Sequence, residues 1–382
     1  MAIATRIGPG REILDAAEKA PADKPNESPV LRTFYRGEHT NFYPDEASLE
    51  RDDAVARYLL CGLVPAAPMI GPENVVVAFG SCFARFLADH LSAIGYNVPT
   101  KRDTTSYISI MDDGIVNTFA MRQQFEWAWQ NRSPQVSLWH GFDGREYGYD
   151  EDVRLKTKSI LDSADVFVLT LGLSEIWYDE PTGEVFWRAI PTARFDPTRH
   201  KFRLSTHAEN LANLHAIYDL IRVHRPQATV VFTLSPIPLQ ATFRDIGCLV
   251  ANAASKAVLR GALEEFIGHV RPNDSNVFYF PSYEIATTCY RRPNGPDRRH
   301  PHLHVIEFNL AAFERYFCHS SMTDADLLEI WKHSQSRDLQ LAQMSPDEAD
   351  RLYRAEREEL GKRLRSERRQ ARQAQKTRRA PF

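Results

Sequence analysis

The sequence predicts a three-layer α/β/α sandwich with a five-stranded parallel sheet, followed by a charged C-terminal helix. Short runs of β-branched and aromatic residues recur along the chain, and helical patterns separate them. Apolar runs of this kind without strict alternation are typical of strands buried on both faces, and the helices between them would cover those faces. The chain has 382 residues, which suits one large α/β domain with extensions.

The predicted elements follow one another in a regular order. Residues 1–32 lack apolar periodicity, so we expect a mobile lead-in there. Residues 33–72 carry aromatic side chains and a helical pattern, and they predict an N-terminal flap packed on the main domain. We expect that domain over 73–340, with strands at 74–79, 95–98, 165–170, 228–234 and 277–280, helices at 84–94, 117–130, 206–224 and 252–270, and a helical region from 303 to 340. A charged helix and a basic tail are expected over 341–382.

Composition excludes several classes of protein. Hydrophobic residues make up 43% and charged residues 25% of the chain, which argues against collagen-like and wholly disordered proteins. No apolar stretch approaches the roughly 20 residues of a membrane helix, and the N-terminus lacks the pattern of a secretion signal. The five cysteines include no CxxC pair, which argues against a disulfide framework and a zinc knuckle. These features predict a cytoplasmic protein.

The net charge of −3 conceals an asymmetry between the body and the tail. Residues 361–382 contain nine basic residues and one acidic residue, which leaves the rest of the chain with 38 basic and 49 acidic residues. The tail is therefore a candidate contact for polyanions, either nucleic acid or an anionic membrane. The alternative interpretation is a solvated helix that ends in a frayed tail.

The first predicted strand runs into Gly80, Ser81 and Cys82, and a helix follows. Glycine permits a tight turn, and the helix N-terminus adds a partial positive charge. An α/β hydrolase-like enzyme presents its nucleophile at such a place, and a helix N-terminus together with an imidazole would lower the pKa of a thiol. Alternatively, Ser81 caps the helix and Cys82 is an ordinary buried thiol.

Small and polar residues also follow two later strands. Gly172 could bring a backbone amide close to a ligand and Ser174 could donate from its hydroxyl, which are two elements of an oxyanion site. Ser235 follows the next buried strand and begins a proline-containing loop at the same edge of the sheet. It is a candidate binding residue because ligands bind beyond the carboxyl ends of parallel strands. Simple turn chemistry would also account for these residues.

Asp297 and His300 follow the last predicted strand. An aspartate three residues before a histidine can hold the imidazole in the tautomer that accepts a proton from a nucleophile. His302 and His304 raise the alternative of a zinc site with these two residues. Pro301 and the lack of a second ligand cluster argue against zinc, so no metal is expected.

The ordered set of these motifs resembles the GSCFA family, which belongs with the SGNH/GDSL hydrolase-like superfamily. The family takes its name from the pentapeptide found here at residues 80–84. Further matching segments span most of residues 34–310. They are DGIVNTFAMRQQFEW from Asp113, LGLSEIW from Leu171, TLSPIPLQATF from Thr233, ANAASKAVLR from Ala251, YFPSYEI from Tyr279 and the Asp297-x-x-His300-Pro301 motif.

The resemblance implies an SGNH-hydrolase-like, flavodoxin-like fold and assigns roles to individual residues. Cys82 stands where the superfamily has its nucleophilic serine, and Ser81 is the alternative if the turn is shifted by one residue. Gly114 would be the second oxyanion donor, with Asn117 beside it as a possible amide donor. Ser174 replaces the asparagine that is the third donor, and the Asp297–His300 dyad is matched without alteration.

These assignments lead to two hypotheses of different classes. The first is an acyl-ester hydrolase or O-acyltransferase that acts on a small-molecule or carbohydrate ester, needs no cofactor and could take acyl-CoA as donor co-substrate. The second is a non-catalytic SGNH-like module that binds carbohydrate or an anion at the helix N-terminus after Gly80.

Overall fold

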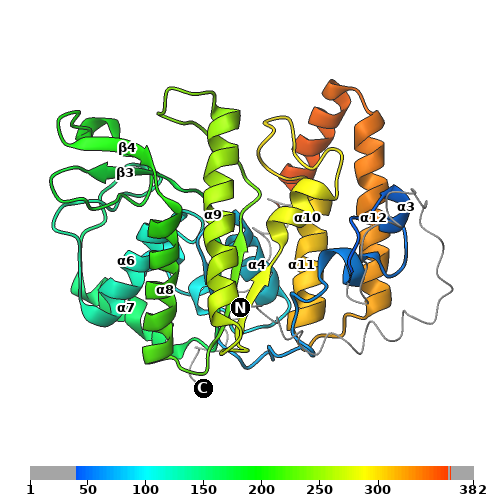
Figure 1. The fold of residues 1–382 in the computed structure, drawn as a ribbon, viewed down its shortest axis with the longest axis horizontal. Coiled ribbons are helices and arrows are strands. Elements are labelled where there is room, and N and C mark those ends of the chain that lie inside the picture. Colours follow the sequence, from blue (N-terminus) through cyan, green and yellow to red (C-terminus); the bar gives the residue numbers. More distant parts are fainter. Residues whose placement is uncertain (1–39, 360–361, 363–382) are drawn as a thin grey trace, which may run out of the picture.

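The core of the computed structural model is a four-stranded parallel sheet with helices on both faces (Figure 1). The structure describes residues 40–359 and residue 362. The strands lie in the order β1-β2-β5-β6, and each is buried along its whole length because helices cover both faces. Their bounds are β1 (Val76–Phe79), β2 (Val166–Leu171), β5 (Thr229–Leu234) and β6 (Val277–Phe280). The predicted α/β class and four of the five predicted strands are confirmed.

The fifth strand predicted at 95–98 is wrong. This segment contributes only an isolated parallel bridge between Val75 and Asn97, with a hydrogen bond of 2.9 Å from the Val76 amide to the Asn97 carbonyl. Gly95 has a positive φ of 96°, and Pro99 opens the short 3₁₀ helix η2 (Pro99–Lys101). A turn before the segment and a proline after it leave too few extended residues to form a ladder.

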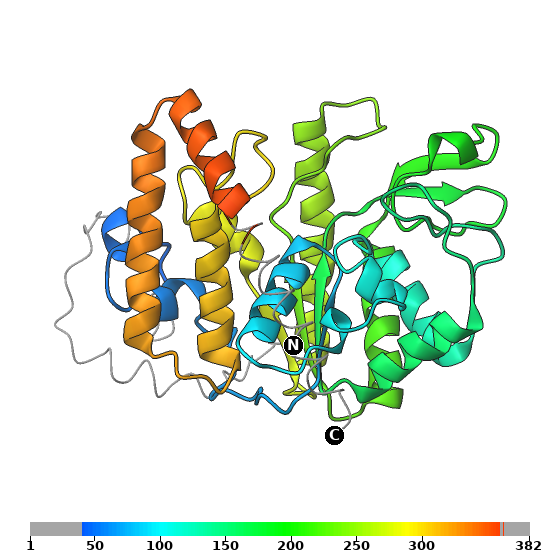
Figure 2. The same ribbon diagram turned by 180° about the vertical axis from the view of Figure 1, so that it is seen from behind.

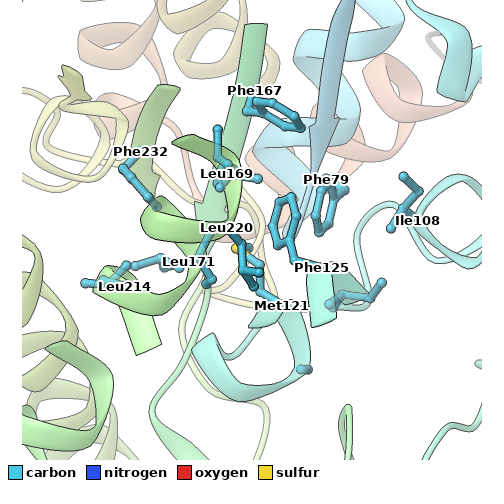
Figure 3. Packing of buried hydrophobic residues seen from close by; sticks show 14 of the residues in the cluster. Phe79, Ile108, Met121, Phe125, Phe167, Leu169, Leu171, Leu214, Leu220 and Phe232 are labelled. Carbon is cyan, nitrogen blue, oxygen red and sulfur yellow. The ribbon is translucent and has the colours of Figure 1, made fainter. Parts of the chain in front are cut away.

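Successive residues of each strand face different helical layers. Phe79, Phe167, Leu169 and Phe232 belong to one buried cluster, and Figure 3 shows these side chains converging with residues of the neighbouring helices. The helices of that cluster are α6 (Thr118–Gln130), α7 (Glu151–Ser163), α8 (His207–His224) and α9 (Cys248–Val270). The helices on the other face are α4 (Cys82–Ala93), α10 (Ser282–Thr288), α11 (Leu303–Phe317) and α12 (Asp324–Gln343). Figure 2 shows α4 on the near face, whereas α8 and α9 are on the near face in Figure 1.

The sequence analysis missed a small antiparallel hairpin. It consists of β3 (Glu175–Asp179) and β4 (His200–Leu204), and it follows β2 directly. Every residue of β4 is only partly buried, so the strand lacks the apolar run by which the buried strands were recognised. The remaining short elements are α3 (Glu46–Leu49), the π-helical turn η1 (Val55–Leu59), α5 (Tyr107–Ile110) and the 3₁₀ helix η3 (Thr192–Arg194).

The described part of the N-terminal segment packs on the α12 side of the sheet. Leu60 and Ile70 are fully buried, and the Trp331 indole donates a hydrogen bond of 3.0 Å to the Leu49 carbonyl. The helical region predicted from 303 to 340 is two helices, α11 and α12, with a break between them. The predicted lead-in at 1–32 lies outside the described residues.

A further helix over residues 346–359 returns to the body of the protein. Ala349 is buried, and Arg357 donates a hydrogen bond of 3.2 Å to the Pro301 carbonyl. The sequence analysis expected a charged helix here but not this packing. Residues 363–382, which hold most of the basic tail, lie outside the described residues, so the polyanion contact stays a prediction. Within the described part of the chain, no helix combines the length and the apolar character needed to cross a membrane.

Candidate functional site

The turn between β1 and α4 requires glycine at position 80. Gly80 has a φ of 129°, and a Cβ atom there would collide with the carbonyl oxygen of Thr170 on β2. The Gly80 amide donates a hydrogen bond of 2.8 Å to the Asp112 carbonyl, which holds the turn against the following loop. Ser81 is buried and is the N-cap residue of α4, although its side chain makes no capping hydrogen bond. Cys82 is therefore the first residue of the helix, at its electropositive end.

The Cys82 thiol lies beside a charged pair. Its Sγ atom is 3.8 Å from Oδ2 of Asp113, and Asp113 forms an ion pair with Arg85. Burial raises the pKa of Cys82, the charge of Asp113 raises it further, and Arg85 opposes both effects. The thiol therefore stays protonated at neutral pH and needs a base before it can attack as a thiolate.

Cys82 also lines an almost wholly apolar pocket. The pocket lies between α4, the loop after β5, and helices α10 and α11. Asn309 is one of the lining residues, and its Oδ1 is buried without a hydrogen-bond partner among the described residues. The other lining residues are Phe83, Phe86, Ser235, Pro236, Ile237, Ser282, Ala286, Pro301, Val305 and Ile306. The thiol therefore has the Asp113–Arg85 ion pair on one side and the apolar pocket on the other.

Asp297 and His300 form a closed pair on the loop before α11. Asp297 Oδ2 lies 2.5 Å from His300 Nδ1, and Oδ1 accepts hydrogen bonds of 2.9 and 3.0 Å from the amides of Arg299 and His300. Burial opposes ionisation of Asp297, but these hydrogen bonds outweigh it and lower its pKa to about 2. Asp297 is therefore ionised at neutral pH and orients the imidazole.

The dyad lies next to the pocket but does not touch the thiol. Pro301, the neighbour of His300, lines the same pocket as Cys82. His300 is partly exposed, and in the part of the chain that the structure describes no hydrogen bond joins it to Cys82 or Ser81. Cys82 therefore lines the pocket and the dyad does not, although the residue after His300 does.

Two predicted oxyanion donors already have partners. The Gly114 amide donates to the Met111 carbonyl at 2.9 Å within a turn. Asn117 is the N-cap of α6, where its Oδ1 accepts from the Ala120 amide at 2.8 Å. Its Nδ2 donates to the carbonyl of Trp187 at 3.1 Å. Either residue would have to give up an existing hydrogen bond before it could serve a substrate.

Ser174 and Gly172 are also engaged, beyond the end of β2. The Ser174 hydroxyl donates to the Ser255 carbonyl at 2.9 Å, and the Ser174 amide donates to the Ser255 hydroxyl at 2.9 Å. The Gly172 carbonyl and the Ser235 carbonyl each accept a hydrogen bond of 2.6 Å from Nζ of Lys256 on α9. Of these residues, Ser235 alone lines the pocket that contains Cys82.

The sequence analysis missed several charged residues at these strand ends. Asp113 and Lys256 lie inside the segments that carried the family resemblance, and a charged residue within an otherwise apolar or small block was a signal available in the sequence. Arg85 stands one helical turn after Ser81. Arg188 had no such signal, because it lies between β3 and β4, outside the segments that carried the resemblance. Burial lowers the pKa of Arg188, and the nearby Asp113 and Cys82 oppose that shift.

His302 and His304 differ from His300 in that they are buried, whereas His300 is partly exposed. Both imidazoles are almost fully buried, and their rings stack with centroids 5.6 Å apart. Tyr353 of the C-terminal helix packs edge-on against His302 at 5.2 Å. The described residues contain no group of three or more His, Cys, Asp or Glu side chains placed to hold a metal ion.

The fold and the motif residues described above bear on the family to which the chain belongs. The first strand of the parallel sheet ends in a glycine turn with a cysteine at the helix N-terminus, and the loop before α11 carries an Asp–His pair. The chain belongs to the GSCFA family, whose family model matches residues 75–313. The match covers all four strands of the parallel sheet, Cys82, the Asp297–His300 pair and most of α11. It excludes α12 and the helix at 346–359. A comparison with curated proteins found no match.

Proposed function

We propose that this GSCFA protein is an SGNH-like acyl-ester hydrolase or O-acyltransferase in which Cys82 is the nucleophile. The observation that supports the proposal is that Cys82 and Pro301, the residue after His300 of the Asp297–His300 pair, line one pocket. The Gly80 turn supports it, because only glycine fits there and the turn presents Cys82 at the positive end of α4. A short acyl chain would occupy the apolar pocket.

The reaction begins with proton transfer from the Cys82 thiol to Nε2 of His300, while Asp297 stabilises the imidazolium. The thiolate attacks the ester carbonyl, and the tetrahedral intermediate collapses to a thioester as the C–O bond breaks. The proton on His300 passes to the departing alcohol. Water or an acceptor hydroxyl then attacks the thioester, with His300 as the base, and regenerates the thiol.

The amides of the first turn of α4 are the best placed oxyanion donors. The first amides of a helix have no intrahelical acceptor, and those of Cys82 and Phe83 lie at the reacting sulfur. Gly114, Asn117 and Ser174 already have partners, so in this proposal they contribute only after rearrangement or serve to hold the loops. A carbohydrate ester and an acyl-CoA donor remain the proposed substrates.

A second function is favoured by the state of the thiol. The raised pKa of Cys82 and the lack of a hydrogen bond from His300 among the described residues suit a non-catalytic module that binds carbohydrate or an anion at the α4 N-terminus. In that case Cys82 would react with alkylating agents no faster than another half-buried helix-terminal cysteine.

Activity measurements on substituted proteins separate the two functions. Aryl acetates and acetyl-CoA serve as donors, and turnover is followed together with mass spectrometry of the trapped adduct. Cys82→Ala should lose nearly all turnover, Ser81→Ala should retain most of it, and Cys82→Ser should be slow because a hydroxyl is much less acidic than a thiol. A hydroxylamine-labile adduct is expected on the Cys82 peptide.

Cys248 provides a matched control because it is also half-buried and is the first residue of a long helix after a glycine N-cap. Cys248→Ala should leave turnover unchanged. An adduct on Ser81 would move the nucleophile by one residue. Full activity in Cys82→Ala would refute the thiol mechanism. No adduct with any donor would favour the binding module.

A further inference from the structure

The guanidinium of Arg188 has a buried nitrogen without a hydrogen-bond partner, and the charges of Asp113 and Cys82 act on this group. Its Nη1 atom is buried without a hydrogen-bond partner, and no hydrogen bond or ion pair with a described residue reaches the rest of the group. Other arginines with a buried unpartnered nitrogen have a partner elsewhere on the same side chain, as Arg222 has in Asp274 and Arg357 in the Pro301 carbonyl. A buried donor without an acceptor costs about 1–3 kcal/mol, so an acceptor from outside the chain would relieve a real penalty.

Phe142, which is 60% exposed, lies against this guanidinium. The guanidinium carbon lies 4.0 Å from the centre of the Phe142 ring, which is a close cation–π distance. This contact with the ring gives the guanidinium N–H groups no oxygen acceptor. This is the arrangement that suits two-point recognition of an oxyanion.

A chain of contacts leads from Arg188 to the Cys82 thiol. The tip of the Phe142 ring lies 3.3 Å from the position that a Cβ would take on Gly114. Gly114 follows Asp113, whose Oδ2 is 3.8 Å from Cys82 Sγ. The stacked arginine and the sulfur therefore border the same loop.

The other cations around this loop have ion-pair partners, and Arg188 does not have one among the described residues. Arg85 is paired with Asp113. Lys101 is paired with Asp112 at 2.8 Å and with Asp89 at 3.1 Å. These carboxylates equal the cations in number once Arg188 is counted, but Arg188 itself has no ion-pair partner in the described part of the chain.

We propose that Arg188, stacked on Phe142, binds a carboxylate or phosphate group of the substrate next to Cys82. The proposal rests on the proposed function only in assigning this anion to the molecule that gives or accepts the acyl group. It narrows the substrate class to esters or acceptors that carry an oxyanion on the side opposite the apolar pocket. A neutral sugar ester would leave Arg188 unsatisfied.

Alkylation of Cys82 with a charged and a neutral reagent tests the proposal without any turnover. Iodoacetate carries a carboxylate and iodoacetamide is its neutral analogue, so the ratio of their rates at Cys82 reports the local positive charge. Both reagents need the thiolate, and the ratio therefore cancels a change in thiol pKa. Arg188→Gln should lower the ratio about fivefold, and Arg188→Lys should retain most of it, because a charge within reach of the sulfur acts mainly on the anion.

Arg271 supplies the matched control. It is half-buried, lies over the Phe278 ring at 5.5 Å, and precedes β6, at the amino edge of the sheet. Arg271→Gln should leave the ratio at Cys82 unchanged. Inorganic phosphate should also slow the reaction of unmodified protein with iodoacetamide more than chloride does at equal ionic strength, which tests phosphate as the bound group.

An unchanged ratio in folded Arg188→Gln would overturn the proposal. If that variant does not fold, the lack of protection by phosphate and an iodoacetate preference at Cys82 no greater than at Cys248 would overturn it in the unmodified protein. The outcome is distinct from that of the acyl chemistry. An inactive protein with an Arg188-dependent ratio would refute the acyl chemistry and retain the anion site, and an active protein with an unchanged ratio would do the reverse.

Discussion

The end of β1 and the ends of β2 and β5 lie along the same edge of the sheet, yet their polar groups are in opposite states. At the end of β2, Ser174 exchanges hydrogen bonds with Ser255, and Lys256 links the carbonyls beyond β2 and β5. At the end of β1, the Cys82 thiol has one long contact, and the guanidinium of Arg188, from the chain after β3, has no hydrogen-bond or ion-pair partner among the described residues.

This contrast identifies the part of the edge that is available for chemistry. A polar group whose hydrogen bonds are complete contributes to stability, and its removal leaves a buried partner unsatisfied. An unsatisfied group next to a pocket can bind or react without first breaking the fold. We therefore expect substitutions after β2 to change stability, and substitutions after β1, other than at Gly80, to change reactivity.

The largest effect on stability is expected from Gly80→Ala, because the backbone at this position after β1 has no room for a side chain. The new Cβ would collide with the Thr170 carbonyl, and a φ of 129° strains any residue other than glycine. The free energy of unfolding should fall by about 3 kcal/mol or more. Urea denaturation measures it. Gly95→Ala is the control, since its φ is 96° but no atom lies within 4 Å of the added Cβ, and it should lose only about 1–2 kcal/mol.

The next effect concerns Lys256, which is fully buried. Burial lowers the pKa of Lys256 to about 7 from an ordinary value near 10.5. Between these values the unfolded chain binds the proton and the folded protein does not, so this group makes stability rise with pH across that window. The slope is at most about 1.4 kcal/mol per pH unit.

Comparison of the native protein with Lys256→Met isolates this contribution, because the thiols and tyrosines that titrate in the same range are common to both proteins. The difference in the free energy of unfolding between native protein and Lys256→Met should change in favour of the native protein from pH 7 to pH 10. A pH-independent difference would show that Lys256 keeps its charge in the folded state.

A smaller effect separates Ser174 from Cys82 directly. Ser174→Ala removes a fully buried hydroxyl that donates a hydrogen bond to the Ser255 carbonyl. The free energy of unfolding should therefore fall by about 1–3 kcal/mol. The alkylation rate of Cys82 should stay the same. Cys82→Ala should change stability by less than about 1 kcal/mol, because its sulfur makes only a weak contact. Thermal or urea unfolding of the two variants side by side checks the contrast, and equal losses would remove it.

The smallest effect is expected at the helix over 346–359, which braces the loop of the dyad. The Tyr353 ring lies directly on Gly295, five residues before His300, and packs against His302. Tyr353→Ala should destabilise the protein by about 1–2 kcal/mol and lower turnover through the position of His300. Turnover and unfolding are measured together, and Arg354→Ala on the exposed side of the same helix is the control. Unchanged turnover would separate the helix from the site.

The sequence by itself determined the four strands of the parallel sheet, though not their number, and the turn at the first strand. Buried parallel strands have to be continuous apolar runs, and four such runs became β1, β2, β5 and β6. Gly80 marks a backbone conformation that only glycine adopts readily, so the strand–turn–helix unit was visible in a few adjacent residues. Asp297 and His300 are three residues apart, and their contact is equally local.

The tertiary structure alone decided which of the remaining polar residues are free. Ser174 looks like an available donor until Ser255, 81 residues further along the chain, is seen to saturate it. Asn117 is likewise occupied by the carbonyl of Trp187, 70 residues away. Arg188 carries no local pattern, and its interaction with the charges of Asp113 and Cys82 depends on the path of the chain between β3 and β4. Hydrogen-bond satisfaction is a property of contacts between distant segments, and periodicity and spacing report only on neighbours along the chain.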